Sequence, residues 1–200
     1  MSTPQLTPQD ITLMYGTAWK EEDTAAYTQQ AIRCGFRAID TANQRKHYYE
    51  AGVGEAVQAS IGAGICRRED LFLQSKYTYQ AGQDHRLPYD ANASLPTQVE
   101  QSFAQSLLHL HTDYLDSYIL HGPLHQSGFG PEDQSVWKAM ETLKQSRKTR
   151  FLGVSNVSPE QLKILLKTAS IPPDFVQNRC YATTGWDHEV RALCRQANIR

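Results

Sequence analysis

The 200-residue sequence lacks long hydrophobic runs and has no excess of charge of either sign. No apolar stretch approaches the ~20 residues that a membrane-spanning helix needs, so a membrane protein is not predicted. Twenty Lys and Arg residues against 21 Asp and Glu residues give a formal net charge of −1. Because no large basic field is expected, neither nucleic acid nor an anionic membrane is an expected partner. The first ten residues have no positive start and apolar core, so no signal peptide is predicted.

Cysteine is scarce and unpaired in the sequence. The four residues, Cys34, Cys66, Cys180 and Cys194, form no CxxC pair, so neither a zinc site nor a redox motif is indicated. We interpret them as reduced thiols, mostly packing residues, in a cytoplasmic protein.

Two glycine-rich phosphate-binding motifs are also missing. Neither GxGxxG nor GxxxxGK followed by Ser or Thr occurs, which argues against an open dinucleotide-binding sheet and against a P-loop. Hydrophobic residues are 40% of the chain and charged residues 20%, an ordinary composition for a soluble domain.

Six short apolar runs alternate with six helical patterns, which predicts a parallel sheet with helices outside it. Ser158, followed by Pro159, and Asp187 are expected to cap two of the helices. The strands are expected at residues 11–17, 36–40, 71–76, 114–121, 151–156 and 175–178, and the helices at 24–35, 50–64, 94–110, 132–146, 158–169 and 186–199.

Polar residues stand at the C-terminal ends of the expected strands: Asp40, Lys76, His121, Asn156 and Asn178. An open doubly wound sheet and a (β/α)8 barrel both fit the alternation, but in a barrel these ends converge on one face, where active sites lie. Six of the eight units are present. We therefore predict one domain over residues 1–200, an incomplete (β/α)8 barrel that stops where a seventh strand would begin.

Three of these residues suggest one chemistry. Asp40 and Lys76 at neighbouring strand ends are expected to pair. A tyrosine beside that ammonium, Tyr48 or Tyr49, would have its pKa lowered and become a better general acid, while His121 orients a carbonyl oxygen. Taken singly, each has an ordinary explanation: a turn cap for Asp40, a solvated lysine and a satisfied core histidine.

Four segments of the sequence resemble, in the same order, the signatures of the aldo-keto reductase family. They are GFRAIDTANQ with YYEAGVGEAV, DLFLQSKYT, YLDSYILHGP and FLGVSNVSPEQL. The resemblance implies a (β/α)8 barrel that binds NADPH, or else NADH, and reduces small aldehydes and ketones. It implies a catalytic set of Asp40, a loop tyrosine, Lys76 and His121. It also implies that the cofactor is held by Asp40, Ser155, Asn156, Gln177 and Asn178. The substrate pocket would be lined by Trp19 and His121.

The sequence departs from the family pattern in the loop after Asp40. The family commonly has its tyrosine five residues after the aspartate, where this sequence has Arg45, and counting back from Glu50 places that position on His47. We choose Tyr48, with Tyr49 as the alternative. An ungapped count on the sixth strand favours Asn178 over Gln177 as the equivalent of the family's glutamine. The family's C-terminal third is missing, and its N-terminal hairpin is reduced.

The preferred hypothesis is hydride transfer from NADPH to a carbonyl carbon, with Tyr48 as proton donor and no metal. Two alternatives stay open: a truncated, non-catalytic interaction protein, and a barrel lyase or isomerase with a Schiff base on Lys76. Open barrel edges are expected to pair with another copy of the chain. Surface positions are expected for His109, His111 and His125. Arg45 and Lys46 are expected to be solvated charges, with contact to an anionic substrate as the alternative.

Overall fold

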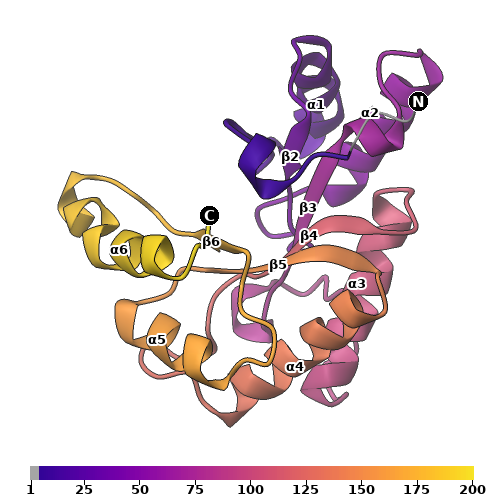
Figure 1. Cartoon of the computed structure of the whole chain (residues 1–200). Helices are drawn as coiled ribbons and strands as arrows, with labels where there is room; N and C mark the ends of the chain where they lie inside the picture. The colour runs from indigo at the N-terminus through magenta and orange to yellow at the C-terminus, as the bar shows by residue number, and fades with distance from the viewer. Residues whose placement is uncertain (1–4) are drawn as a thin grey trace.

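The computed structural model describes residues 5–200 and contains six parallel strands in the order β1-β2-β3-β4-β5-β6, each followed by a helix (Figure 1). The strands are β1 Tyr15–Gly16, β2 Ala38–Asp40, β3 Phe72–Tyr77, β4 Leu115–Leu120, β5 Thr149–Ser155 and β6 Phe175–Gln177. The helices are α1 Thr24–Arg33, α2 Glu50–Gly62, α3 Leu95–His109, α4 Pro131–Gln145, α5 Pro159–Thr168 and α6 His188–Gln196. Short 3-10 helices are η1 Pro8–Asp10, η2 Glu21–Asp23, η3 Arg68–Asp70, η4 Gln80–Gly82 and η5 Ala182–Asp187.

All six expected strands and all six expected helices are present, most within a few residues of their predicted bounds. The exception is the strand expected at 11–17, which is only two residues long in the structure. The predicted cap at Ser158 is confirmed, because its hydroxyl accepts a hydrogen bond from the Gln161 amide at 3.2 Å. Asp187 is the N-cap residue of α6, as predicted, but it is left-handed, with φ of 51°, and its side chain makes no capping hydrogen bond.

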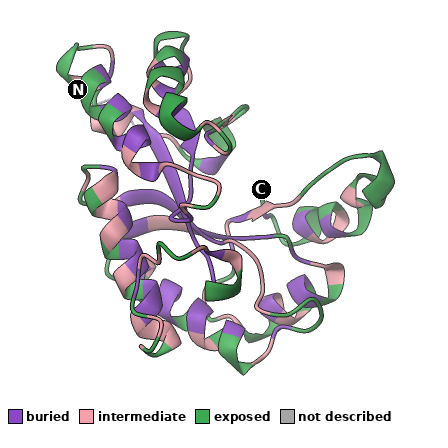
Figure 2. Ribbon diagram, turned by 180° about the vertical axis from the view of Figure 1, so that it is seen from behind, coloured by how far each residue is buried: buried purple, intermediate pink, exposed green. Residues whose placement is uncertain are grey.

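The sheet curls, with β1 at one end and β6 at the other and the helices along the outer side (Figure 1). Burial is concentrated on the strands and on the helix faces turned toward them (Figure 2). The larger core lies between helices and sheet and includes Ile32 of α1, Val53 of α2, Phe103 of α3 and Met140 of α4. The fold is therefore an incomplete (β/α)8 barrel, as predicted.

The concave side of the sheet carries a second, smaller core of Ala38, Phe72, Ile119 and Phe175, one residue from each of four strands. Residues of the N-terminal segment, Leu6, Ile11 and Met14, pack against it.

Gly153 of β5 faces this interior, where a Cβ would lie 2.3 Å from the Ile119 side chain and 2.9 Å from the Phe175 carbonyl oxygen. A glycine is required at this point because the neighbouring strand leaves no room for a side chain.

Along each strand the interior becomes polar toward the C-terminal end. Side chains two residues apart on a strand share a face, so Asp40 follows Ala38, Gln74 and Lys76 follow Phe72, and Gln177 follows Phe175. The register places Asp40 beside Gln74 and Ser155 beside Gln177. The sheet therefore gathers polar groups above an apolar floor.

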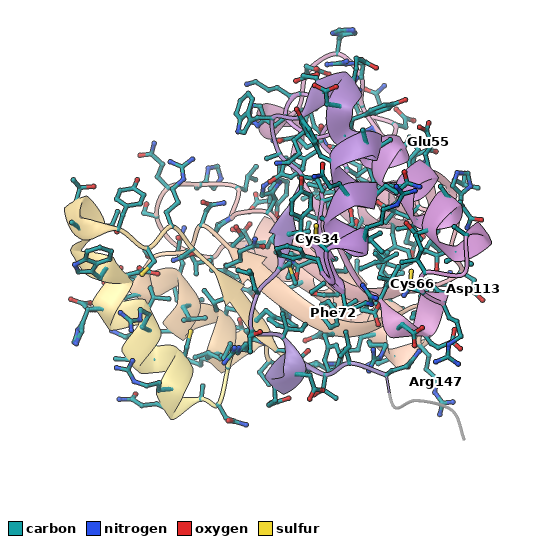
Figure 3. All side chains as sticks on the ribbon, turned by 90° about the horizontal axis from the view of Figure 1, so that it is seen from above. Cys34, Glu55, Cys66, Phe72, Asp113 and Arg147 are labelled. Carbon is teal, nitrogen blue, oxygen red and sulfur yellow. The ribbon has the colours of Figure 1, made fainter. Side chains whose placement is uncertain are left out.

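The cysteines are only partly packing residues. Cys66 and Cys194 are buried, but Cys34 and Cys180 are exposed, which corrects the interpretation of the four as mostly packing residues. Figure 3 shows Cys34 and Cys66 as separate side chains, and all four are free thiols. Within residues 5–200, no helix combines the length and apolar character needed to cross a membrane.

Candidate active site

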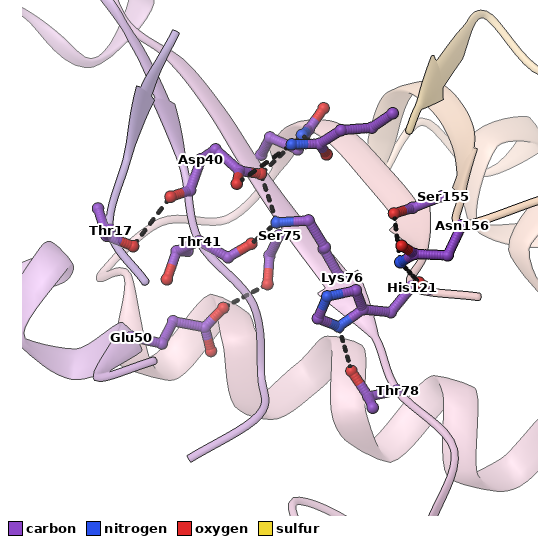
Figure 4. Close-up of polar contacts among 12 residues, drawn as sticks. Thr17, Asp40, Thr41, Glu50, Ser75, Lys76, Thr78, His121, Ser155 and Asn156 are labelled. Atoms are coloured by element: carbon purple, nitrogen blue, oxygen red, sulfur yellow. Dashed lines mark hydrogen bonds and ion pairs between the residues drawn. The ribbon is translucent and has the colours of Figure 1, made fainter. Parts of the chain in front are cut away.

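An ion pair between Lys76 and Asp40 forms the centre of the site (Figure 4). The Lys76 Nζ atom lies 2.5 Å from Asp40 Oδ1 and also donates to the Thr41 carbonyl oxygen at 2.8 Å. Both charged residues are buried, with Lys76 only 1% exposed. Burial lowers the pKa of the Lys76 ammonium, and the Asp40 carboxylate opposes that shift. The predicted pairing of these two residues is thus present.

Gln74 connects this pair to the far strand of the sheet. Its Nε2 atom donates to Asp40 Oδ1 at 2.7 Å and to Gln177 Oε1 at 2.9 Å. Gln177 Nε2 in turn lies 3.4 Å from Asp40 Oδ2. A chain of side-chain amides therefore crosses the concave face from β2 to β6 and fixes the orientation of Gln177.

Tyr48 lies against the ion pair, with Lys76 Nζ 4.9 Å from the centre of its ring. Its ring also meets the His121 ring edge-on, with centroids 5.9 Å apart. Within the described part of the chain, the Tyr48 hydroxyl has no hydrogen-bond partner. Tyr49 is elsewhere: it precedes α2, and the Arg45 guanidinium lies 4.6 Å from the centre of its ring.

The expectation that Lys76 lowers the pKa of the tyrosine is wrong. Burial raises the pKa of the Tyr48 hydroxyl, and the Asp40 carboxylate raises it further. The reason is that Asp40 compensates the Lys76 charge at close range, so the desolvation of Tyr48 decides the direction. The phenol is therefore protonated at neutral pH.

His121, one residue after β4, is held by Thr78. The Thr78 Oγ1 atom lies 2.7 Å from Nδ1 of the imidazole, and Nε2 has no partner within residues 5–200. Burial and the nearby Lys76 ammonium lower the pKa of His121 to about 3. The ring is therefore neutral at physiological pH and carries one N–H; where the Thr78 hydroxyl donates to Nδ1, that N–H is on Nε2.

Asn156 closes the end of β5 in a left-handed conformation, with φ of 54°, which asparagine tolerates better than most residues. Its Nδ2 atom donates to the His121 carbonyl oxygen at 2.7 Å and to Ser155 Oγ at 2.9 Å. These bonds leave the Ser155 hydroxyl proton and Asn156 Oδ1 unused. One free donor beside one free acceptor matches the oxygen and the NH2 group of a nicotinamide carboxamide, so the residues present fit that group.

The two alternatives on the sixth strand differ in their partners. The Asn178 side chain is fully engaged with the backbone of Val157, accepting from its N–H at 3.1 Å and donating to its carbonyl oxygen at 2.8 Å. Gln177 keeps an amide N–H directed into the concave face, with only the 3.4 Å approach to Asp40. Of the two, Gln177 has the more available amide, although the ungapped count favoured Asn178.

Two neighbouring pockets open at this end of the sheet. The first, here the inner pocket, has a volume of about 230 Å³ and is lined by Tyr48, Lys76, His121, Ser155, Asn156, Gln177, Asn178 and Arg179. The second, here the outer pocket, has a volume of about 370 Å³ and is lined by Gln44, His47, Thr78, Tyr79, Ala81, Gly82, His121, Gly122, Pro123, Leu124, Asn156 and Arg179. His121, Asn156 and Arg179 belong to both.

Trp19, Arg45 and Lys46 all lie outside the lining of the two pockets. Trp19 is 69% exposed and its ring lies against that of His47, with centroids 4.0 Å apart and the planes tilted by 38°, so it reaches the outer pocket only through that histidine. Arg45 forms ion pairs with Glu21 at 3.4 Å and Glu22 at 3.6 Å. Neither Arg45 nor Lys46 lines either pocket, which favours the expected solvated positions over contact with an anionic substrate.

The surface assignment of His109 is also wrong. His109 is half-buried, and its Nδ1 atom lies 2.9 Å from Oε2 of the buried Glu50. The other carboxylate oxygen of Glu50 accepts a hydrogen bond from the Ser75 hydroxyl. His111 and His125 are exposed, as expected. This cluster lies behind the site, and its residues line neither of the two pockets.

Gln74, Thr78 and Arg179 are site residues that the sequence prediction missed. The first two could have been found, since they stand two residues before and two residues after Lys76 and alternate residues on a strand share a face. Arg179 follows β6 in an irregular segment, and no sequence pattern indicated it. Within the described residues, no group of three or more His, Cys, Asp or Glu side chains is arranged to hold a metal ion.

Comparison with known families gives one consistent result. A model described as the Aldo/keto reductase family matches residues 12–200. The aldo-keto reductase family 4 member C11 of Arabidopsis thaliana is 30% identical over 180 residues, which are 84% of this chain and 52% of that protein. The chain thus spans about half the length of the curated relatives it matches.

Solved structures agree with the sequence comparison. An aldo-keto reductase from a Medee basin deep-sea metagenome library matches with a TM-score of 0.75 and 25% identity, over 100% of this chain and 65% of that one. An aldo-keto reductase of the silkworm Bombyx mori, complexed with NADPH, matches with a TM-score of 0.70 and 27% identity, over 90% of this chain and 55% of that one.

Proposed function

The chain belongs to the aldo/keto reductase family, and we propose that its site reduces aldehydes or ketones to alcohols with a nicotinamide cofactor, preferably NADPH. The observation that carries the proposal is the inner pocket, in which Tyr48, Lys76 and His121 line one small cavity. A protonated phenol, a buried ammonium and a neutral imidazole around one cavity suit a reaction in which negative charge develops on an oxygen. The NADPH complex of the silkworm relative supports the choice of cofactor.

In this proposal Tyr48 donates the proton. Its free hydroxyl and raised pKa mean that it carries a proton throughout the neutral range. An alkoxide is a stronger base than a phenolate, so the proton moves from Tyr48 to the developing alkoxide oxygen. The phenolate left behind lies next to the Lys76 ammonium, which stabilises it.

His121 positions the substrate. When Thr78 donates to Nδ1, the imidazole presents its N–H from Nε2 and hydrogen-bonds the carbonyl oxygen. Because the ring has a pKa of about 3, it polarises the carbonyl as a neutral donor and adds no positive charge of its own. Asp40 and Gln74 act through Lys76 and Gln177, whose positions they fix.

The cofactor would be held at its nicotinamide end by Ser155, Asn156 and Gln177. The Ser155 hydroxyl has a proton to donate, Asn156 Oδ1 has a free lone pair, and the Gln177 amide is oriented by Gln74. When bound there, the dihydronicotinamide supplies the hydride that reduces the carbonyl carbon.

Paired tyrosine variants test this assignment. NADPH oxidation by the 200-residue chain is followed in the presence of 4-nitrobenzaldehyde for wild type, Tyr48→Phe and Tyr49→Phe. Tyr48→Phe should lower kcat by roughly 10²–10⁴-fold, the usual contribution of a general acid. Tyr49→Phe should retain activity, because its ring packs under Arg45 outside both pockets. Full activity of Tyr48→Phe would refute the assignment of the proton donor, and wild-type protein that binds NADPH without oxidising it would refute the reductase function.

A further inference from the structure

Arg179 is the unpaired cation of the site. It is exposed at the end of β6, it lines both pockets, and it makes no hydrogen bond or ion pair within residues 5–200. Lys76 is bound to Asp40 and Arg45 to Glu21 and Glu22, and Lys46 lines neither pocket. Arg179 is thus the guanidinium that remains available to a ligand.

The outer pocket contains no residue that would repel an anion. Its lining includes no carboxylate among the residues that the structure describes. Its two histidines, His47 and His121, both have lowered pKa values and are neutral at pH 7. At neutral pH the formal charge of the lining is therefore that of Arg179 alone.

The inner pocket suits the nicotinamide end of the cofactor, and the outer pocket suits the body of the substrate. Of the groups suited to a carboxamide, Ser155 and Gln177 line the inner pocket only, and Asn156 lines both pockets. The outer pocket is lined mainly by the loops that follow β2, β3 and β4. His121, which would hold the carbonyl oxygen, is common to both. A carbonyl held at His121 therefore leaves the rest of the substrate in the outer pocket, beside Arg179.

We propose that Arg179 binds a carboxylate on the substrate, remote from the reacting carbonyl, so that the preferred substrates of this chain are carboxylate-bearing aldehydes and ketones. The inference rests on the proposed reductase function and deepens it. A guanidinium presents a planar pair of donors that matches the two oxygens of a carboxylate. The outer pocket, at about 370 Å³, is large enough for a small organic body between the two ends.

The test compares two substrates of nearly equal size, 4-carboxybenzaldehyde and its methyl ester. Their kcat/KM ratio is measured for wild type, Arg179→Met, Arg179→Lys and Arg33→Met. Wild type should favour the acid, and Arg179→Met should lower the acid-to-ester ratio by about fivefold to tenfold, as for the loss of one partly solvated ion pair. Arg179→Lys should keep most of the preference. Arg33 lies on the exposed side of α1, so Arg33→Met removes the same charge elsewhere and should leave the ratio as in wild type.

Two further measurements separate this proposal from its premise. Binding of 4-(hydroxymethyl)benzoate, measured by titration calorimetry without turnover, should weaken about fivefold or more in Arg179→Met, whether or not the chain reduces any aldehyde. Unchanged binding in that variant, or an acid-to-ester ratio equal to that of wild type, overturns the proposal. A weakened NADPH affinity in Arg179→Met with an unchanged substrate ratio also overturns it, because Arg179 would then bind a cofactor phosphate.

Discussion

The ammonium of Lys76 and the carboxylate of Asp40 meet at 2.5 Å, with both residues buried. A buried pair of this kind stabilises a fold only while both partners are present, because either charge alone would be left in a low-dielectric environment. The same pair fixes the position of the ammonium beside the Tyr48 ring. The stability of the fold and the surroundings of the Tyr48 hydroxyl therefore depend on the same contact.

The first prediction concerns this pair. Lys76→Met should lower the free energy of unfolding by about 3–5 kcal/mol, because the buried Asp40 carboxylate loses its counter-ion. The double variant Asp40→Asn/Lys76→Met should recover part of that loss while remaining inactive. Urea unfolding at pH 7 measures both values. A loss below about 1 kcal/mol in the single variant would contradict the assignment of Lys76 and Asp40 as a buried ion pair.

The second prediction concerns Thr78. Thr78→Val keeps the shape of the side chain but removes the hydroxyl that contacts His121 Nδ1, so the imidazole is free to turn or to change tautomer. The expected result is a fall in kcat of about fivefold to tenfold, equivalent to one hydrogen bond, with a smaller change in the affinity for NADPH. Thr78→Ser is the matched control and should keep most of the activity. Equal activity of the Val and Ser variants would show that Thr78 does not orient His121.

The third prediction concerns pH. The pKa of His121 is about 3 in the folded chain, whereas an unfolded histidine titrates near 6.5. Between these values the unfolded state binds more protons, so the free energy of unfolding falls as the pH drops from about 6.5 toward 3 and does not change from this cause above that range. The contribution should amount to about 1–2 kcal/mol between pH 7 and pH 5.

Variants at two histidines isolate that contribution. His121→Gln should unfold with a weaker dependence on pH between 7 and 5 than wild type. His111 is exposed, and His111→Gln should keep the wild-type dependence. The free energy of unfolding is measured by urea unfolding at each pH. An equal dependence on pH in wild type and His121→Gln would contradict the burial of a neutral imidazole at this position.

Much of the site could be predicted because strand ends in a barrel converge on one face. Asp40, Lys76 and His121 each follow a recognisable apolar run, so their convergence needed only the strand order. The pKa of Tyr48 could not be predicted in the same way. The direction of the shift is set first by the burial of the Tyr48 hydroxyl and then by the Asp40 charge, and the depth of burial is not visible in the sequence.

Other elements were less accessible from the sequence. The run at residues 11–17 is apolar like a strand, but only Tyr15 and Gly16 pair with β2, since apolar character alone does not specify backbone hydrogen bonding. Asp187 occupies the N-cap position of α6, yet its backbone is left-handed and its side chain makes no capping hydrogen bond. Arg179 could not be found, because neither its exposure nor its lack of a partner is visible in one dimension.

The fourth prediction concerns the ends of the sheet. β1 and β6 are its outer strands, and a pocket of about 380 Å³ beside β6 is lined in part by Val176, Val190 and Ile199. Outer strands with apolar surroundings tend to pair with other chains. The purified 200-residue chain should therefore show a mass that rises with concentration in light scattering. A monomer of constant mass over a hundredfold range of concentration would contradict this expectation.

The Gln74 amide bridges residues that are far apart along the chain. Gln74 and Gln177 are separated by 103 positions, and Asp40 and Gln177 by 137. Contacts of this separation form late in folding, because a long segment must first lose its freedom before they can be made. During refolding, helix content followed by circular dichroism should thus appear before the ability to bind NADPH, and simultaneous recovery of both signals would argue against this order. Cofactor binding would then report the completion of the fold: a chain that has not finished assembling its sheet has no site with which to bind.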